Sequence, residues 1–244
     1  MDALILHVIS LRYSSWSMRP WLALHHAGAV FETRTASLDL SKQTVAPSGG
    51  MAALSADELA ARRAQGSVRG LFPVLQVGDA RIHESLAIGE WVAERFPAAG
   101  LWPDDVMARA QARALCCEML SGFSQLRTHL SCHLFARVPG FRPDEGTRRE
   151  IGRVFELWSE ALARSGGPYL FGRFTLADAM YYPVRTRFRT YDVAVPAALQ
   201  PYVDALDDTP CVRALTAVAR DAPRIAAYDD YVRGLGGDPD AARG

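Results

Sequence analysis

The sequence predicts an α/β domain with a mixed sheet over residues 1–98, followed by an all-helical domain over residues 103–230. Two observations support this division. In the first hundred residues, short runs of strand length alternate with helical spacings in the order β-α-β, a long connection, then β-β-α. After Pro103, apolar residues recur every three or four positions, as in amphipathic helices. The 244 residues suffice for two small domains that share a substantial core.

Four segments of the first half have the length and composition of strands. The last two are joined by Gly78-Asp79, a dipeptide typical of tight β-hairpins. Helical spacing covers residues 19–27, ended by Gly28, and residues 85–96. The expected strands are residues 3–9, 31–38, 73–77 and 80–83.

A long connection separates the second and third strands. Ser55 is followed three residues later by Glu58, which is the pattern of a capping box and predicts a helix over 56–65. Residues 41–54 before it are rich in Ser, Gly, Pro and Ala and predict an inserted surface loop. Loops of this length are uncommon unless they are functional or mobile.

The helical half begins with one long amphipathic helix, whose apolar stripe runs from Leu115 to Leu134. A second helix is expected over 151–162. Thr175 has the position of an N-cap before a third, which Pro183 should kink. Shorter helices are expected over 199–206 and 211–220. Residues 234–244 offer nothing to bury and predict a flexible tail.

Composition excludes several classes of partner. Lys+Arg and Asp+Glu both total 27, so no net charge attracts nucleic acid or an anionic membrane. No apolar run approaches the ~18 residues of a membrane span, and residues 1–10 lack the basic region of a secretory leader. The 4 cysteines form no CxxC pair, which favours free thiols in a reducing compartment. We therefore expect a cytoplasmic protein without a nucleic-acid or membrane partner.

Serines gather between the first strand and the first helix, in the segment Tyr13-Ser14-Ser15-Trp16-Ser17. Hydroxyls at the start of a helix can cap its free amides, or can point at a thiol or phosphate held there. Ordinary capping is the more frequent use. From the residues alone both interpretations remain open.

Two further junctions carry candidate ligand groups. A cis bond between Phe72 and Pro73 would present the Phe72 backbone to an extended ligand, although a trans proline at a strand edge is far commoner. Glu84 and Ser85 stand where the fourth strand gives way to a helix. From the residues alone Ser85 is expected to be a plain N-cap, which is the commoner use, while its hydroxyl and the free N–H groups could also form a carboxylate site at the helix start.

Other chemistries lack support. The sequence contains no GxSxG elbow, GxGxxG fingerprint or P-loop. His129 and His133 are four residues apart around Cys132, but no further ligand stands at metal spacing, so no metal is expected. The alternate arginines within residues 185–189 cannot share one helical face, and we expect them to be solvated or ion-paired.

Taken together, the motifs resemble soluble glutathione S-transferases over about residues 4–220. The resemblance rests on four motifs in order: Ser-Ser-x-Ser, Phe-Pro-Val-Leu, Glu-Ser-Leu-Ala-Ile and Thr-Leu-Ala-Asp-Ala. Each motif alone is weak, whereas all of them within this order of strands and helices are specific. The stretch SSWSMRPWLAL is most similar to the serine turn of zeta-class and related bacterial transferases, which carry an arginine at the offset of Arg19.

The resemblance implies a thioredoxin-like N-terminal domain that binds glutathione, an all-helical C-terminal domain and a homodimer. It implies glutathione as co-substrate and no metal. Ser14 matches the catalytic serine, whose hydroxyl donates to the glutathione sulfur, and Ser15 is the neighbouring alternative. A hydroxyl donor and a helix N-terminus both favour thiolate over thiol, whose pKa is otherwise near ~8.5.

The remaining ligand contacts are implied in the same way. Phe72 and Pro73 match the pair around a cis-proline, where the preceding backbone binds the cysteinyl part of glutathione. Glu84 and Ser85 match the pair that holds its γ-glutamyl end.

The implied function is activation of the glutathione thiol for attack on a small electrophile, held between the domains near residues 119–123. Two alternatives remain: a non-catalytic glutathione-binding or protein-interaction module of the same fold, and a glutathione-dependent isomerase. Trp16 stands where zeta members have cysteine, so disulfide-exchange chemistry is disfavoured.

Overall fold

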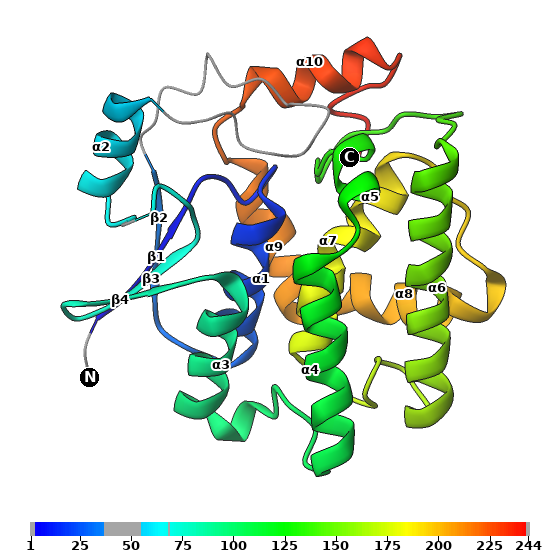
Figure 1. Cartoon of the computed structure of the whole chain (residues 1–244), viewed down its shortest axis with the longest axis horizontal. Coiled ribbons are helices and arrows are strands. Elements are labelled where there is room, and N and C mark those ends of the chain that lie inside the picture. Colours follow the sequence, from blue (N-terminus) through cyan, green and yellow to red (C-terminus); the bar gives the residue numbers. More distant parts are fainter. Residues whose placement is uncertain (1–2, 37–54, 68, 243–244) are drawn as a thin grey trace.

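The computed structural model describes residues 3–36, 55–67 and 69–242. An α/β half and a helical half lie side by side, and α1 (Ser15–His26) runs between the sheet and the helical half (Figure 1). The inserted loop expected over 41–54 lies outside the described residues.

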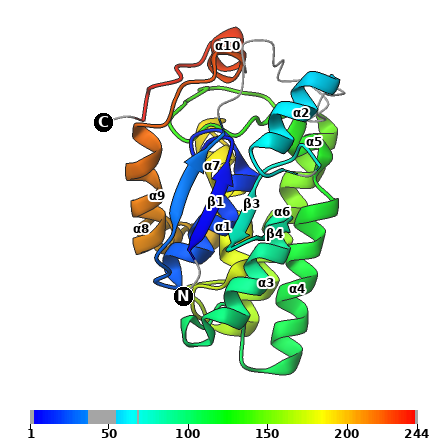
Figure 2. The same cartoon turned by 90° about the vertical axis from the view of Figure 1, so that its left-hand side faces the viewer.

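Within the described residues, the sheet has 4 strands in the order β2-β1-β3-β4. Figure 2 shows β1, β3 and β4 side by side. β1 is parallel to β2 and antiparallel to β3, and β3 forms the expected hairpin with β4. The mixed sheet predicted from the sequence is therefore confirmed. Its strands are β1 Leu4–Val8, β2 Glu32–Thr35, β3 Val74–Val77 and β4 Ala80–His83.

The register of the sheet brings three chain segments to one edge. His7 near the end of β1 lies opposite Val74 at the start of β3, and Val74 lies opposite His83 at the end of β4. The chain that follows β1, precedes β3 and follows β4 therefore leaves the sheet at the same edge. All the candidate ligand residues belong to these segments.

Two further helices complete the α/β half, α2 (Ala56–Ala64) and α3 (Ser85–Arg95). The predicted capping box of α2 is present, with reciprocal bonds between Ser55 and Glu58. α1 begins at Ser15, earlier than the expected residue 19, because Ser14 caps it. The indole of Trp21 donates to Thr33 Oγ1 at 3.0 Å and fixes α1 to the edge strand β2.

The described residues after α3 form helices and the loops that connect them. Two short 3₁₀ turns, Pro97–Ala99 and Ala197–Leu199, connect the larger elements. The α-helices are α4 Val106–Ser121, α5 Ser124–His129, α6 Glu145–Ser165, α7 Leu176–Thr190, α8 Gln200–Asp208, α9 Pro210–Arg220 and α10 Ala226–Gly234.

The expectation of one long helix up to Leu134 is wrong. α4 ends at Ser121, because Gly122 adopts an extended backbone; Phe123 then adopts a left-handed conformation with φ of 58° and turns the chain into the next helix. The next helix is α5, where the Glu150 carboxylate of α6 accepts from the Leu126 amide at 2.7 Å. The apolar stripe is nevertheless buried, since the chain turns around the core instead of leaving it.

Cap chemistry predicts α7 correctly. Thr175 and Asp178 form a fully buried capping box, and the helix continues through Pro183 to Thr190. The Thr186 hydroxyl donates at 2.8 Å to the Pro183 carbonyl within it.

The expectation that residues 234–244 have nothing to pack against is wrong through residue 242. Asp238 exchanges backbone hydrogen bonds of 2.9 and 2.8 Å with Arg137, and Pro239 is buried. α10 also precedes this segment and was not predicted. The partners lie about a hundred residues away, so local sequence gives no sign of them.

One continuous core joins the two halves. Gly89 of α3 allows a close approach, because a Cβ there would lie 2.8 Å from Leu176 Cδ2 of α7. The four cysteines are free thiols, as expected, and only Cys117 is exposed. Within the described part of the chain, no helix is both long and apolar enough to cross a membrane.

Candidate active site

Ser14 lies at the shared edge of the sheet as the N-cap of α1. Its Oγ accepts two hydrogen bonds from Ser17, one from the amide at 3.3 Å and one from the hydroxyl at 3.0 Å. Both bonds occupy acceptor positions, so the hydroxyl proton of Ser14 is available to a ligand. The side chain is half-buried, and the free amides of the first helical turn lie beside it.

Ser15 faces another way. It is buried, and its Oγ accepts from Arg187 Nη2 of α7 at 3.3 Å. Arg187 also donates to the carbonyl oxygen of Leu130. The structure thus separates the two neighbouring serines, with Ser15 in the packing between α1 and the helical half.

A cluster of three arginines surrounds this turn. The guanidinium carbon of Arg19 lies 4.2 Å from the Trp16 ring centroid, and that of Arg127 lies 5.6 Å from it. Together with Arg187 they bring three cations close to the first turn of α1. Within residues 3–36, 55–67 and 69–242, none of the three has a carboxylate within ion-pair distance.

The charges of the arginine cluster act on one another. Arg19 is fully buried, its Nε donates to the Met180 carbonyl at 3.0 Å, and its Nη1 lacks a partner among the described residues. Burial, with the repulsion of Arg187 and Arg127, lowers the pKa of Arg19 to about 9. Such a cluster favours the binding of an anion nearby.

The arginine cluster was missed in the sequence. We expected Arg187 to be solvated or ion-paired, and this is wrong, because it is buried against carbonyl groups and Ser15. Arg185 does form an ion pair, with Asp207 at 2.7 Å. The one sequence signal was the arginine at position 19, which the family resemblance marked.

The Phe72-Pro73 peptide bond is cis. The expectation from the residues alone, a trans proline, is wrong, and the cis bond that the resemblance implied is confirmed. Phe72 is buried two residues before the start of β3, and it packs in a small cluster with Ala36, Val74 and Ile9.

Glu84 and Ser85 follow β4 at the same edge. The expected N-cap role of Ser85 is wrong: Glu84 occupies the cap position without a side-chain cap bond, and Ser85 is the first helical residue. Ser85 is only 3% exposed, and its Oγ has no hydrogen-bond partner among the described residues. Glu84 holds a backbone φ of 70°, a conformation costing about 1–3 kcal/mol outside glycine. A buried hydroxyl without a partner among the described residues calls for an explanation, and a bound polar group is one such explanation.

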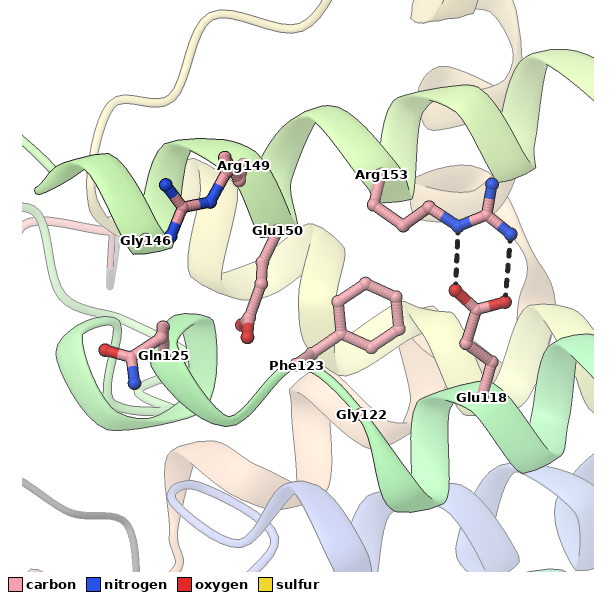
Figure 3. Close-up of a pocket in the computed structure, with 8 residues that line it drawn as sticks. All are labelled: Glu118, Gly122, Phe123, Gln125, Gly146, Arg149, Glu150 and Arg153. Carbon is pink, nitrogen blue, oxygen red and sulfur yellow. Dashed lines mark hydrogen bonds and ion pairs between the residues drawn. The ribbon is translucent and has the colours of Figure 1, made fainter.

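A separate cavity of about 340 Å³ lies between the α4–α5 turn and α6 (Figure 3). Phe123 lines it, and Glu118 of α4 faces Arg153 of α6 across it in a paired contact of 2.8 and 3.2 Å. The family resemblance implied an electrophile near residues 119–123; of these, Phe123 lines the cavity and Met119 is fully buried.

The histidines considered as metal ligands have other partners. His129 Nδ1 pairs with Thr147 Oγ1 at 2.9 Å, while His133 Nε2 bonds Asp229 at 2.9 Å. No group of three or more metal-ligating side chains comes together in the part of the chain that the structure describes.

Two family models match the chain. The glutathione S-transferase N-terminal domain matches residues 13–95, and the glutathione S-transferase C-terminal domain matches residues 107–228. The chain belongs to the glutathione S-transferase family. The resemblance, the two-part fold and the class of glutathione-dependent enzyme that it implied are therefore confirmed.

Individual relatives agree with this assignment. Maleylacetoacetate isomerase of Rhizobium meliloti is 32% identical over 204 residues, covering 80% of this chain and 85% of that protein. A probable maleylacetoacetate isomerase of Vibrio cholerae is 27% identical and covers 63% of this chain and 71% of its own.

Solved structures show the same fold. Maleylacetoacetate isomerase of Anaeromyxobacter dehalogenans, with bound dicarboxyethyl glutathione and citrate, matches with a TM-score of 0.61 and 26% identity over 91% of this chain and 94% of its own. A glutathione transferase homologue of Burkholderia with bound glutathione matches with a TM-score of 0.65, covering 90% of this chain and 99% of its own at 22% identity.

Proposed function

We propose that this transferase binds glutathione at the shared sheet edge and that Ser14 donates a hydrogen bond to its sulfur. The observation that supports this proposal most directly is the hydrogen bonding of the Ser14 hydroxyl. It accepts two hydrogen bonds from Ser17, so its own proton remains for a ligand. The helix N-terminus and the nearby arginine cluster both favour the thiolate over the thiol. The activated sulfur would then attack a small electrophile, with glutathione as co-substrate.

The other contacts follow from the same edge. We assign the Phe72 backbone, next to Pro73, to the cysteinyl part of glutathione. Glu84 and Ser85 would hold the γ-glutamyl end, the first with its carboxylate on the ammonium and the second with its buried hydroxyl on the carboxylate. The unpartnered state of Ser85 Oγ among the described residues supports this role.

A second candidate is glutathione-dependent isomerisation of an electrophile that carries carboxylates. It is favoured by the relatives named maleylacetoacetate isomerase and by three arginines without a carboxylate partner in the described part of the chain. A transferase-like module that binds glutathione without turnover is the alternative from another class. The available Ser14 proton disfavours that alternative.

Thermal unfolding with glutathione tests the proposal. A ligand of the native state raises the melting temperature as its concentration rises. We expect a rise at millimolar glutathione and none with a glutathione analogue that lacks the γ-glutamyl group. No shift with glutathione, while a known transferase responds, would contradict the proposed site.

We propose that the chain acts as a homodimer, as its family resemblance implies, and that it is cytoplasmic, as its composition and cysteine usage led us to expect. Light scattering should then give about twice the 26.7 kDa of one chain. A mass of 26.7 kDa over a wide concentration range would contradict the dimer.

A further inference from the structure

A ring of hydrogen-bonded polar side chains, buried on the Tyr13 side and partly exposed at Arg224 and Asp240, ties the turn before Ser14 to residues 239–240. Arg12 is fully buried, and its Nη2 bonds Asp240 at 2.9 Å and the Pro239 carbonyl at 3.3 Å. Asp240 also binds Arg224 at 2.5 Å, and Arg224 binds Asp229 of α10 at 2.9 Å. Asp229 in turn bonds Tyr13, the residue next to Arg12, so the chain of contacts returns to the serine turn.

Asp229 closes the ring. Its Oδ1 accepts from the hydroxyl of Tyr13 at 2.9 Å and from Nε2 of His133 at 2.9 Å. The side chain is only 4% exposed. Burial alone would raise the pKa of Asp229, but the bonds from His133, Tyr13 and Arg224 hold it below its ordinary value. The carboxylate is therefore charged and fully engaged within the fold.

The donors around Asp229 are themselves fixed. His133 accepts the Phe135 amide on Nδ1 at 3.3 Å, which leaves the proton on Nε2 for Asp229. The ring of Tyr13 packs edge-on against His133, with centroids 4.8 Å apart. Tyr13 is 1% exposed, so its hydroxyl has no access to water as an alternative acceptor.

The fixed tyrosine directly precedes the candidate catalytic serine. The Ser14 amide bonds the Ser10 carbonyl at 3.3 Å, and the Arg12 carbonyl accepts from the Leu134 amide at 3.1 Å. Backbone contacts therefore hold the turn on one side, and the ring holds it on the other. Figure 1 shows α10 lying across one end of the molecule, after α9.

We infer that Asp229 is a positioning residue, which holds Ser14 in its ligand-ready orientation through the hydrogen bond to Tyr13. This inference rests on the proposed function of Ser14. The family models match only residues 13–95 and 107–228, so Arg12, Asp229 and Asp240 lie outside the matched ranges. The C-terminal segment thereby becomes part of the active-site support.

The test compares Tyr13→Phe, which removes a single hydroxyl, with Asp229→Asn and with the double variant. Hydrogen exchange of the peptide around residues 11–18, without ligand, should be about five- to tenfold faster in both single variants. With glutathione bound, the apparent pKa of its thiol should rise by about half to one unit. The kcat at neutral pH should fall about three- to tenfold, with little change in KM.

The double variant shows whether the two residues act as one. If Asp229 works through Tyr13, the double variant should equal Asp229→Asn, whereas independent effects would multiply. Matched controls are Asp230→Asn, on the exposed face of α10, and Tyr169→Phe, whose hydroxyl bonds Thr209 at 3.1 Å. Both controls should leave the exchange and the thiol pKa unchanged.

Two results would overturn the inference. One is a lower melting temperature in Asp229→Asn and Tyr13→Phe with unchanged hydrogen exchange around residues 11–18. This would show that Asp229 stabilises the fold as a whole and does not hold the serine turn. The other is multiplied effects in the double variant. A different result would contradict the proposed function itself, namely a thiol pKa of glutathione that stays at its free value with the wild-type protein. Hydrogen exchange without ligand would then still test whether Asp229 holds the serine turn.

Discussion

The guanidinium of Arg187 donates to Ser15 at 3.3 Å from across the domain boundary, and this bond distinguishes two adjacent serines. Ser15 is buried by α7, whereas Ser14 is half-buried with its proton free. Sequence alone offers both as candidates. The contact with Arg187 places Ser15 in the packing between α1 and α7, and it supports our proposal that Ser14 is the serine that meets the ligand.

Replacing Ser14 by alanine should therefore raise the apparent pKa of bound glutathione by about one to two units, since a hydrogen bond to a charged group contributes ~1.5–3 kcal/mol. Affinity should change little, because the remaining contacts are untouched. Turnover at neutral pH should fall and recover in part at alkaline pH. Ser15→Ala is the control, and should mainly lower the free energy of unfolding, by ~1 kcal/mol. Loss of activity in Ser15→Ala, with the Ser14→Ala rate and pH profile normal, would reverse the assignment.

Ser85→Ala separates ligand binding from stability. The Ser85 hydroxyl is buried without a partner among the described residues, so its removal should leave the melting temperature of the free protein unchanged or slightly higher. The Kd for glutathione should rise about fivefold, equivalent to ~1 kcal/mol. Calorimetry and thermal unfolding measure the two effects. A destabilised free protein with normal affinity would show that Ser85 serves the fold instead.

Local signals in the sequence predict much of this fold. The Gly78-Asp79 hairpin and the capping boxes at Ser55 and Thr175 each depend on residues within a few positions of one another. The four strands are predicted for the same reason, because an alternating or apolar run is a local property. Once the strands pair in their order, the segments that carry the candidate ligand-binding residues meet at one edge of the sheet.

Contacts between distant residues could not be predicted. Arg187 meets Ser15 across 172 positions, and Arg12 meets Asp240 across 228. The break at Phe123 was hidden because its apolar neighbours keep a helical spacing through a turn. The contacts of α10 with the serine turn also join distant residues, as between Asp229 and Tyr13, and therefore leave no local pattern in the sequence.

Burial of His133 should make stability depend on pH. Burial lowers its pKa from 6.5 to about 4, although the nearby Asp229 and Asp240 oppose this shift and Arg12 adds to it. Between these pH values the unfolded chain binds a proton that the folded chain does not. The free energy of unfolding should therefore fall as pH falls, by up to ~1.4 kcal/mol per unit.

Urea unfolding near pH 7 and near pH 5 measures this slope. His133→Asn, which keeps a donor for Asp229, should show a shallower slope, since it cannot bind the proton. Equal slopes in the two proteins would place the pH dependence elsewhere.

The last prediction concerns Gly237, which lets the C-terminal segment dock beside Arg137. A Cβ on Gly237 would lie 2.5 Å from the Arg137 carbonyl oxygen and 2.7 Å from Val138 Cγ2. Because the first of these neighbours is backbone, the segment itself must move, so Gly237→Ala should lower the free energy of unfolding by about 1–3 kcal/mol. Gly234→Ala is the matched control: a Cβ there meets nothing within 4 Å, and alanine suits the last position of α10. Urea unfolding should therefore show a loss in the first variant and none in the second, and equal stability of both would mean that residues 237–240 are not docked as described.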